Sequence, residues 1–143
     1  DKESVNNKLI AGPIWDFNHG FGNCDYYNAW ETDSWNISYL YDDMDQRAFW
    51  WLKLWNDESF NIKLKNRYKE LRMSVLSTNN IHSKIDSFVT LLGSSVDRNF
   101  EKWPILDEYI WPNYQVFKTY QEEISYLKKW IDNRLIWMDS QLY

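Results

Sequence analysis

The stretch Gly12–Asn23 reads Gly-Pro-Ile-Trp-Asp-Phe-Asn-His-Gly-Phe-Gly-Asn, and the rest of the chain is organised around it. Apolar residues lie just before this stretch and at its start, with Gly and Pro between them. This pattern predicts one short strand or hairpin over Lys8–Asp16. Two glycines follow Asp16 within six positions. They allow the backbone to take a positive φ or to approach a ligand closely.

Asp16 itself has two interpretations. A carboxylate at the carboxyl end of a buried strand, followed by a Gly-rich turn, can hold a metal ion against phosphate groups. An Asp in this position can also be a turn residue whose side chain bonds its own backbone. The stretch by itself leaves both interpretations open.

Length and composition favour one domain, residues 1–143, that is large enough to bury a core. Phe, Trp and Tyr make up 19% of the residues, with 10 Trp and 10 Tyr. Because Tyr and Trp combine an apolar body with a polar tip, they suit clefts, interfaces and sugar-binding faces. A core built from large side chains is the alternative explanation for most of them.

Charge and cysteine content exclude several classes of function. The net charge is −5, from 16 basic and 21 acidic residues, which argues against a phosphate-tracking nucleic-acid surface. Cys24 is the one cysteine, so the chain forms no internal disulfide and no Cys-based zinc site. No apolar run approaches a membrane span, and no signal peptide is visible. Because the chain begins with Asp1 directly before a buried strand, we expect it to be part of a longer protein.

Beyond the opening stretch, Cys24–Gln46 lacks any helical or alternating period and predicts an irregular loop. Its many aromatic residues argue against disorder. Asp42, Asp43 and Asp45 have a spacing reminiscent of a calcium loop, but the rest of an EF-hand is absent, so a solvated loop is predicted.

Helices are predicted from Arg47 onward, joined in one place by an extended connection over Pro104–Lys118. Thr119 and Glu122 form the pattern of a capping box at the start of the last helix. Trp103 and Trp130 lie in or beside apolar helical faces and are candidates for the core. The predicted helices are Arg47–Trp55, a helix capped by Asn56 or Asp57 and running to about Ser74, one capped by Ser77 or Thr78 and ended by Gly93, one from Ser94 or Ser95 to Trp103, and one from Thr119 to the C-terminus.

Other residues that could bind a ligand or take part in catalysis have mainly structural interpretations. His82 lies on a polar side of its helix and is predicted at the surface, whereas His19 is either a loop residue or a ligand contact near Asp16. The tryptophans of the first helix, Trp50, Trp51 and Trp55, are predicted to be core rather than a carbohydrate platform. The sequence contains no GxSxG, CxxC, HExxH or GxxxxGK[ST] motif.

Four stretches, in order and covering nearly the whole chain, resemble the C-terminal part of the spore coat protein H (CotH) family of atypical kinases. The family shows Gly-Pro-Val/Ile-Trp-Asp-Phe-Asp followed by Phe-Gly-Asn, as in Leu9–Asn23, and Arg-Asn-Phe-Glu-Lys-Trp-Pro through Trp-Pro-Asn, as in Arg98–Asn113. Phe49–Leu71 resembles its Trp-rich segment, and Tyr120–Leu142 its closing helix.

The resemblance implies a mainly α structure with a short N-terminal β element, similar to the C-terminal lobe of a reduced protein-kinase-like fold. It implies phosphoryl transfer from ATP to Ser or Thr of a partner protein, such as a bacterial spore-coat or cell-surface protein. Asp16 would be the catalytic Mg²⁺ ligand, and Trp15 would lie against the nucleotide. Asn18 takes the place of the family's second carboxylate, and could offer the metal a carbonyl oxygen without charge.

The family's Gly-rich loop, its nucleotide-anchoring Lys and its catalytic-loop Asp lie upstream of the Trp-Asp-Phe motif, and none is in these 143 residues. We therefore expect Mg²⁺ and ATP to bind only in the full-length protein, and the fragment alone to be inactive. The alternative is a non-catalytic domain of the same family that binds a protein or polysaccharide. Asn18 favours this alternative, and the intact Trp15-Asp16-Phe17 favours the kinase.

Overall fold

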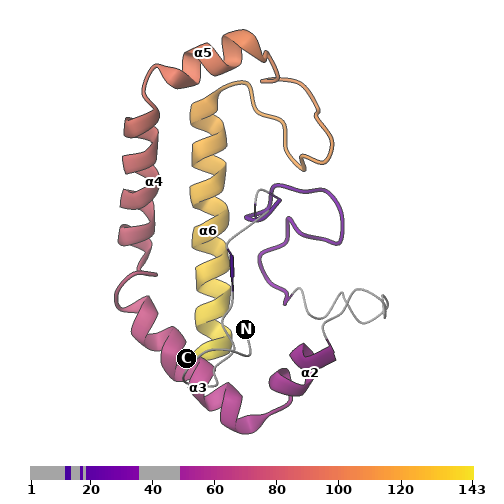
Figure 1. Cartoon of the computed structure of the whole chain (residues 1–143), viewed down its shortest axis with the longest axis vertical. Helices are drawn as coiled ribbons and strands as arrows, with labels where there is room; N and C mark the ends of the chain where they lie inside the picture. Colours follow the sequence, from indigo (N-terminus) through magenta and orange to yellow (C-terminus); the bar gives the residue numbers. More distant parts are fainter. Residues whose placement is uncertain (1–11, 14–16, 18, 36–48) are drawn as a thin grey trace.

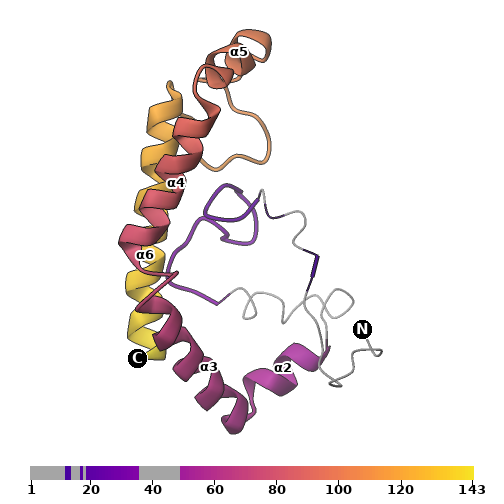
Figure 2. The ribbon, with the colours of Figure 1, turned by 60° about the vertical axis from the view of Figure 1, so that its left-hand side comes forward.

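The computed structural model describes residues 12–13, 17, 19–35 and 49–143. Helix α6 is the longest and runs through the middle of the molecule, with α4 beside it and α5 across one end (Figure 1). Helices α3 and α2 bend away below the other end (Figure 2). In chain order the helices are α2 (Phe49–Trp55), α3 (Glu58–Arg72), α4 (Thr78–Leu92), α5 (Ser95–Lys102) and α6 (Tyr120–Leu142).

The starts of α3, α4 and α6 follow the capping residues expected from the sequence. The Asp57 side chain accepts a hydrogen bond from the Phe60 backbone N–H at 2.7 Å, and Ser77 caps α4 in the same way. Thr119 and Glu122 form both bonds of the capping box at the start of α6. Because each cap satisfies backbone donors that the first turn leaves unpaired, these short polar patterns fix where the helices begin.

The prediction of a mainly helical chain is confirmed for the described residues, which contain no β-sheet. An isolated antiparallel bridge between Cys24 and Asn113 is the one β-type pairing among them. Of the predicted strand or hairpin, only Gly12 and Pro13 are described, so it stays a prediction, as does the resemblance to a kinase lobe. In this part of the chain, no helix combines the length and the apolar character needed to cross a membrane.

The core is thin and centred on α6. Ile131, Leu135 and Leu142 of α6 are buried, and Tyr68 of α3 joins them at 5% exposure. Cys24, in the loop, is also buried. The apolar face predicted for the last helix is therefore the face that packs.

Helices α4 and α6 are antiparallel, and a hydrogen bond and an ion pair join them. His82 bonds Asp132 at 2.8 Å, and Asp86 pairs with Lys128. From His82 to Asp86 the residue numbers rise along α4, whereas those of their partners fall from Asp132 to Lys128, so the two helices run in opposite directions. His82 is thus half-buried and paired, so its prediction as a surface residue was wrong. The polar character of its helix side comes from facing a carboxylate on the neighbouring helix.

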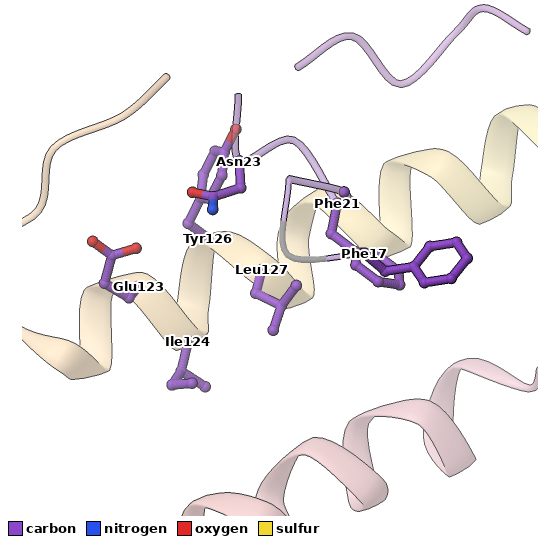
Figure 3. Close-up of a pocket in the computed structure, with 8 residues that line it drawn as sticks. Phe17, Phe21, Asn23, Glu123, Ile124, Tyr126 and Leu127 are labelled. Atoms are coloured by element: carbon purple, nitrogen blue, oxygen red, sulfur yellow. The ribbon is translucent and has the colours of Figure 1, made fainter. Parts of the chain in front are cut away.

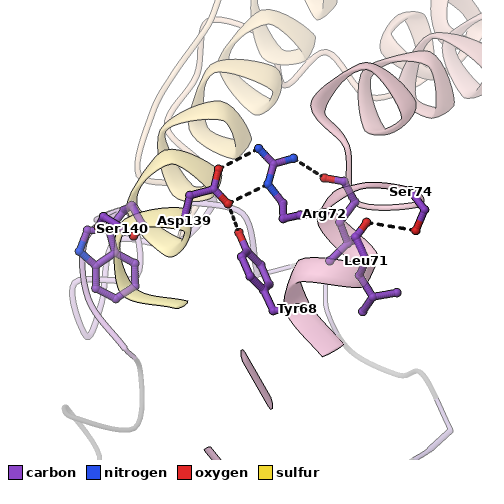
Figure 4. A network of polar contacts seen from close by, with 8 residues as sticks. Tyr68, Leu71, Arg72, Ser74, Asp139 and Ser140 are labelled. Carbon is purple, nitrogen blue, oxygen red and sulfur yellow. Dashed lines mark hydrogen bonds and ion pairs between the residues drawn. The ribbon is translucent and has the colours of Figure 1, made fainter. Parts of the chain in front are cut away.

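A polar network closes the end of the array where α3 meets α6 (Figure 4). Asp139 accepts hydrogen bonds from Arg72 Nε at 2.9 Å, from Arg72 Nη2 at 2.9 Å and from the Tyr68 hydroxyl at 2.7 Å. Arg72 also donates to the Leu76 carbonyl oxygen. This bidentate pair ties the C-terminal turn of α3 to the last turns of α6.

Several tryptophans are more exposed than the sequence predicted. Trp50 and Trp51 are 46% and 43% exposed, and Trp103 is 58% exposed. Helix α2 packs on α3 at the edge of the array, so one side of this short helix is covered and the other is not. The prediction that these α2 tryptophans are core was therefore wrong for Trp50 and Trp51, while Trp55 is half-buried against Trp35.

Candidate functional site

The predicted site residues Trp15, Asp16 and Asn18 lie outside the described residues. Their neighbours on the C-terminal side are described and show how the segment is held. The Gly20 N–H donates to the Phe17 carbonyl at 3.0 Å, and the Asn23 N–H donates to the Gly20 carbonyl at 3.2 Å. Two consecutive tight turns thus follow the Trp-Asp-Phe motif, and residues 19–23 form what we call the motif loop.

Gly22 brings the motif loop into direct contact with α6. Its φ is +79°, and a Cβ at this position would lie 2.4 Å from Trp130 Cδ1. The Tyr126 hydroxyl donates to the Gly22 carbonyl oxygen at 3.1 Å, and Phe21 meets Trp130 edge-on at 5.9 Å. A side chain at position 22 cannot be accommodated without a shift, so the sequence needs glycine here.

The motif loop and α6 enclose a pocket of about 310 Å³ (Figure 3). Phe17 and Phe21 lie on the loop side, while Glu123 and Leu127 project from α6. We call this cavity the motif pocket. Its lining residues are Phe17, Gly20, Phe21, Asn23, Glu123, Ile124, Tyr126 and Leu127. It is a small cavity lined mainly by aromatic and aliphatic side chains, one of which belongs to Phe17, the residue that follows Asp16 in the sequence.

Glu123 is the one acidic side chain among the described residues that line the motif pocket. Partial burial raises the pKa of its carboxyl above the ordinary value. Carboxylate and carboxamide oxygens, as in Glu123 and Asn23, are ligands that Mg²⁺ accepts. However, no three metal-ligating side chains of the His, Cys, Asp and Glu types gather within the described part of the chain. A Mg²⁺ site here would therefore draw its other ligands from water or from residues outside the described part of the chain.

Sequence reasoning missed Glu123, and the reason is local. Glu122 and Glu123 are adjacent in the first turn of α6, where acidic residues are common because they stabilise a helix N-terminus. Glu122 performs the capping, whereas Glu123 faces the pocket. The capping-box pattern identifies Glu122 from the sequence, whereas only the packing of the motif loop on α6 shows that Glu123 lines a pocket.

His19 lies in the motif loop, as predicted for a loop residue, while its alternative as a ligand contact near Asp16 stays a prediction. Its Nδ1 lies 3.0 Å from the Tyr26 hydroxyl oxygen, and the two rings meet edge-on. The residue is not among those that line the motif pocket. The structure therefore brings Glu123 to this pocket and leaves His19 on the adjoining loop.

A protein-family model described as "CotH kinase protein" matches residues 2–138. The chain belongs to the CotH family. The match covers the motif that contains Trp15, Asp16 and Asn18, and it also covers Glu123 and the rest of α6 as far as Met138. No curated protein and no solved structure matches the chain. Membership of the CotH family, predicted from four separate stretches, is thus confirmed over almost the entire length.

Proposed function

We propose that this CotH-family chain is the C-terminal part of an atypical protein kinase that transfers phosphate from ATP to Ser or Thr of a partner protein. The observation that carries the proposal is the intact Trp15-Asp16-Phe17 motif within a family match that spans nearly the whole chain. Directly after the motif, the chain is fixed to α6 through Gly22 and Tyr126. Such anchoring matters because phosphoryl transfer depends mainly on positioning and on charge stabilisation.

Each motif residue has a role in this proposal. Asp16 contributes a negatively charged oxygen that holds Mg²⁺ on the ATP phosphates, and the metal offsets phosphate charge that otherwise opposes transfer. Asn18 contributes a neutral oxygen and weakens metal affinity relative to a carboxylate. Trp15 packs against the nucleotide.

The experiment uses the longer protein that we expect to contain this chain. Isothermal titration calorimetry of Mg²⁺-ATP and transfer of labelled phosphate are measured for the wild type and for Asp16→Ala, Asp16→Asn and Asn18→Asp. Both Asp16 variants should lose transfer, because the required property is negative charge on a hard oxygen ligand. Asn18→Asp should bind Mg²⁺-ATP as tightly as the wild type or more tightly.

Asp25→Asn is the matched control, since it removes a nearby carboxylate, two residues after the motif loop, that accepts a hydrogen bond from Tyr109 and does not line the motif pocket. It should retain transfer. If Asp16→Asn keeps the wild-type affinity and turnover, Asp16 is a turn residue, because Asn forms the same turns. The kinase assignment of this site would then be wrong.

A further inference from the structure

A second concave site lies where the loop after Cys24 meets the exposed side of α6. It has a volume of about 420 Å³. We call it the Trp30 pocket: its walls are residues 30–33 of the loop, Tyr114 of the extended connection, and the α6 side chains around Lys129 and Asn133. Tyr126 of α6 lines both this site and the motif pocket. Phe17, the described residue of the Trp-Asp-Phe motif, lines only the motif pocket of the two.

The walls of the Trp30 pocket are built before any ligand arrives. The Trp130 indole N–H donates to the Trp30 carbonyl oxygen at 2.8 Å, and Arg134 donates to the Thr32 carbonyl at 2.9 Å. The rings of Trp30 and Tyr114 stack with centroids 4.7 Å apart and planes 6° from parallel. Because these contacts already fix the loop, a ligand need not order it, which lowers the entropic cost of binding.

The polar groups at the rim are available. The side chains of Asp33, Lys129 and Asn133 make no hydrogen bond to any residue within the described part of the chain. They place an acceptor, a donor and a group with both functions around an aromatic wall. The pocket thus combines a stacked aromatic pair with several polar groups, so a ligand can be held both by ring contacts and by hydrogen bonds.

The charges select among ligand classes. Glu31 and Asp33 are offset by Lys129 at the rim and by Arg134, whose charge interacts with Asp33, so the pocket favours neither an anion nor a cation. A purely apolar ligand would leave the rim's polar groups unpaired and desolvated, which is unfavourable. A neutral molecule with many hydroxyl groups and a flat C–H face satisfies all three conditions.

We propose that the Trp30 pocket binds a saccharide unit of an oligosaccharide. The sugar ring lies against the Trp30–Tyr114 pair, and its hydroxyl groups exchange hydrogen bonds with Asp33, Lys129 and Asn133. The site is independent of phosphoryl transfer, so it is compatible with a kinase that docks on a glycan-bearing surface. It does not require the proposed function to be correct.

The test is titration of the purified 143-residue chain with cellohexaose, xylohexaose and chitohexaose, followed by calorimetry and by tryptophan fluorescence. At least one of these oligosaccharides should bind at millimolar concentration. Asn133→Ala and Asp33→Ala should each weaken that binding about two- to tenfold, the effect of losing one hydrogen bond. Tyr114→Ala should weaken it further. Circular dichroism shows whether each variant keeps its helices.

Trp111→Ala is the matched control, because this tryptophan is 70% exposed and lies outside the Trp30 pocket. It should bind as the wild type does. Three outcomes overturn the proposal: none of the three oligosaccharides binds, Trp111→Ala loses binding as completely as Tyr114→Ala, or folded Asn133→Ala and Asp33→Ala bind with unchanged affinity. A Lys-rich peptide that binds through Asp33 while the sugars do not would identify a cation pocket instead.

Discussion

At the scale of single residues, Gly22 determines how closely the motif loop can approach α6. Two separate features make it irreplaceable: its positive φ and the 2.4 Å that would separate an added methyl carbon from the Trp130 ring. Gly93 also has a positive φ, of +46°, but its added Cβ would meet the nearest atom only at 3.6 Å. A comparison of substitutions at the two positions therefore distinguishes the cost of backbone strain from the cost of overpacking.

We expect Gly22→Ala to lower the free energy of unfolding by more than Gly93→Ala. Both variants carry backbone strain of about 1–3 kcal/mol. Gly22→Ala adds an overpacking cost of about 1–3 kcal/mol, because a methyl group would enter the space of Trp130. Denaturant unfolding of both variants measures the difference. Equal midpoints for the two would show that the motif loop moves away from α6 at little cost.

Individual residues also show what the sequence could predict. Capping residues were predictable because a cap and the donors it satisfies lie within one turn, as for Asp57 and Phe60. The exposure of His82 and Trp103 was not predictable, because it depends on whether residues distant in the sequence cover these side chains. His82 needs Asp132 on another helix, whereas Trp103 follows α5 where little covers it.

At the scale of elements, the Arg72–Asp139 pair is the main polar connection between α3 and α6. The side chains of Arg72 and Asp139 are 15% and 32% exposed, so solvent screens the pair only partly. We expect Asp139→Ala to lower the free energy of unfolding by about 1–3 kcal/mol, because it leaves the Arg72 guanidinium and the Tyr68 hydroxyl without their acceptor. Asp86→Ala, which breaks a more exposed pair with Lys128, should cost less than about 1 kcal/mol. Urea unfolding of both variants provides the comparison.

The same pair predicts a pH dependence. Hydrogen bonding to Arg72 holds the pKa of Asp139 below its usual value of 3.8. A carboxyl group whose pKa is lowered by folding stabilises the folded state above its unfolded pKa, and this contribution is lost as the pH falls through the folded pKa. The stability difference between wild type and Asp139→Ala should thus be full at neutral pH and should shrink below about pH 4. A difference that persists unchanged at about pH 2 would contradict the ionic interpretation.

Element order was also largely predictable, whereas the packing of the loop was not. Helical periodicity and caps place α3, α4 and α6 within a few residues of their observed bounds. By contrast, Cys24–Gln46 was predicted only as an irregular loop. Side chains of α6 hold the described part of this loop and the residues just before it. Tyr126, Trp130 and Arg134 each donate a hydrogen bond to a backbone carbonyl oxygen there. No periodic signal encodes such contacts, so neither pocket could be assembled from the sequence.

At the scale of the whole molecule, the small core contrasts with extensive exposed apolar surface. A groove of about 510 Å³ between α4 and α6 is lined mainly by apolar side chains, including Ile85, Phe88, Leu127 and Ile131. Helical periodicity predicts an apolar face on each of these helices, but Phe88 is 53% exposed, and the sequence could not show that the two faces leave a gap. CotH-family membership was predictable at this scale because the motifs run in order along nearly the entire chain.

We expect the isolated 143-residue chain to transfer no phosphate, although it belongs to the CotH family. The family resemblance assigns the nucleotide-anchoring Lys and the catalytic-loop Asp to positions upstream of Asp16, and no stretch of these residues supplies them. Among the described residues that line the motif pocket there is no Lys or Arg to bind phosphate oxygens, and Glu123 would repel them. Since positioning and charge stabilisation supply nearly all of the catalysis, Asp16 alone is insufficient. The measurement is transfer of labelled phosphate from ATP with Mg²⁺, to the chain itself and to a Ser-rich protein, with Asp16→Ala as the control. Transfer by the wild-type chain above the level of that control would show that these residues contain a complete catalytic site.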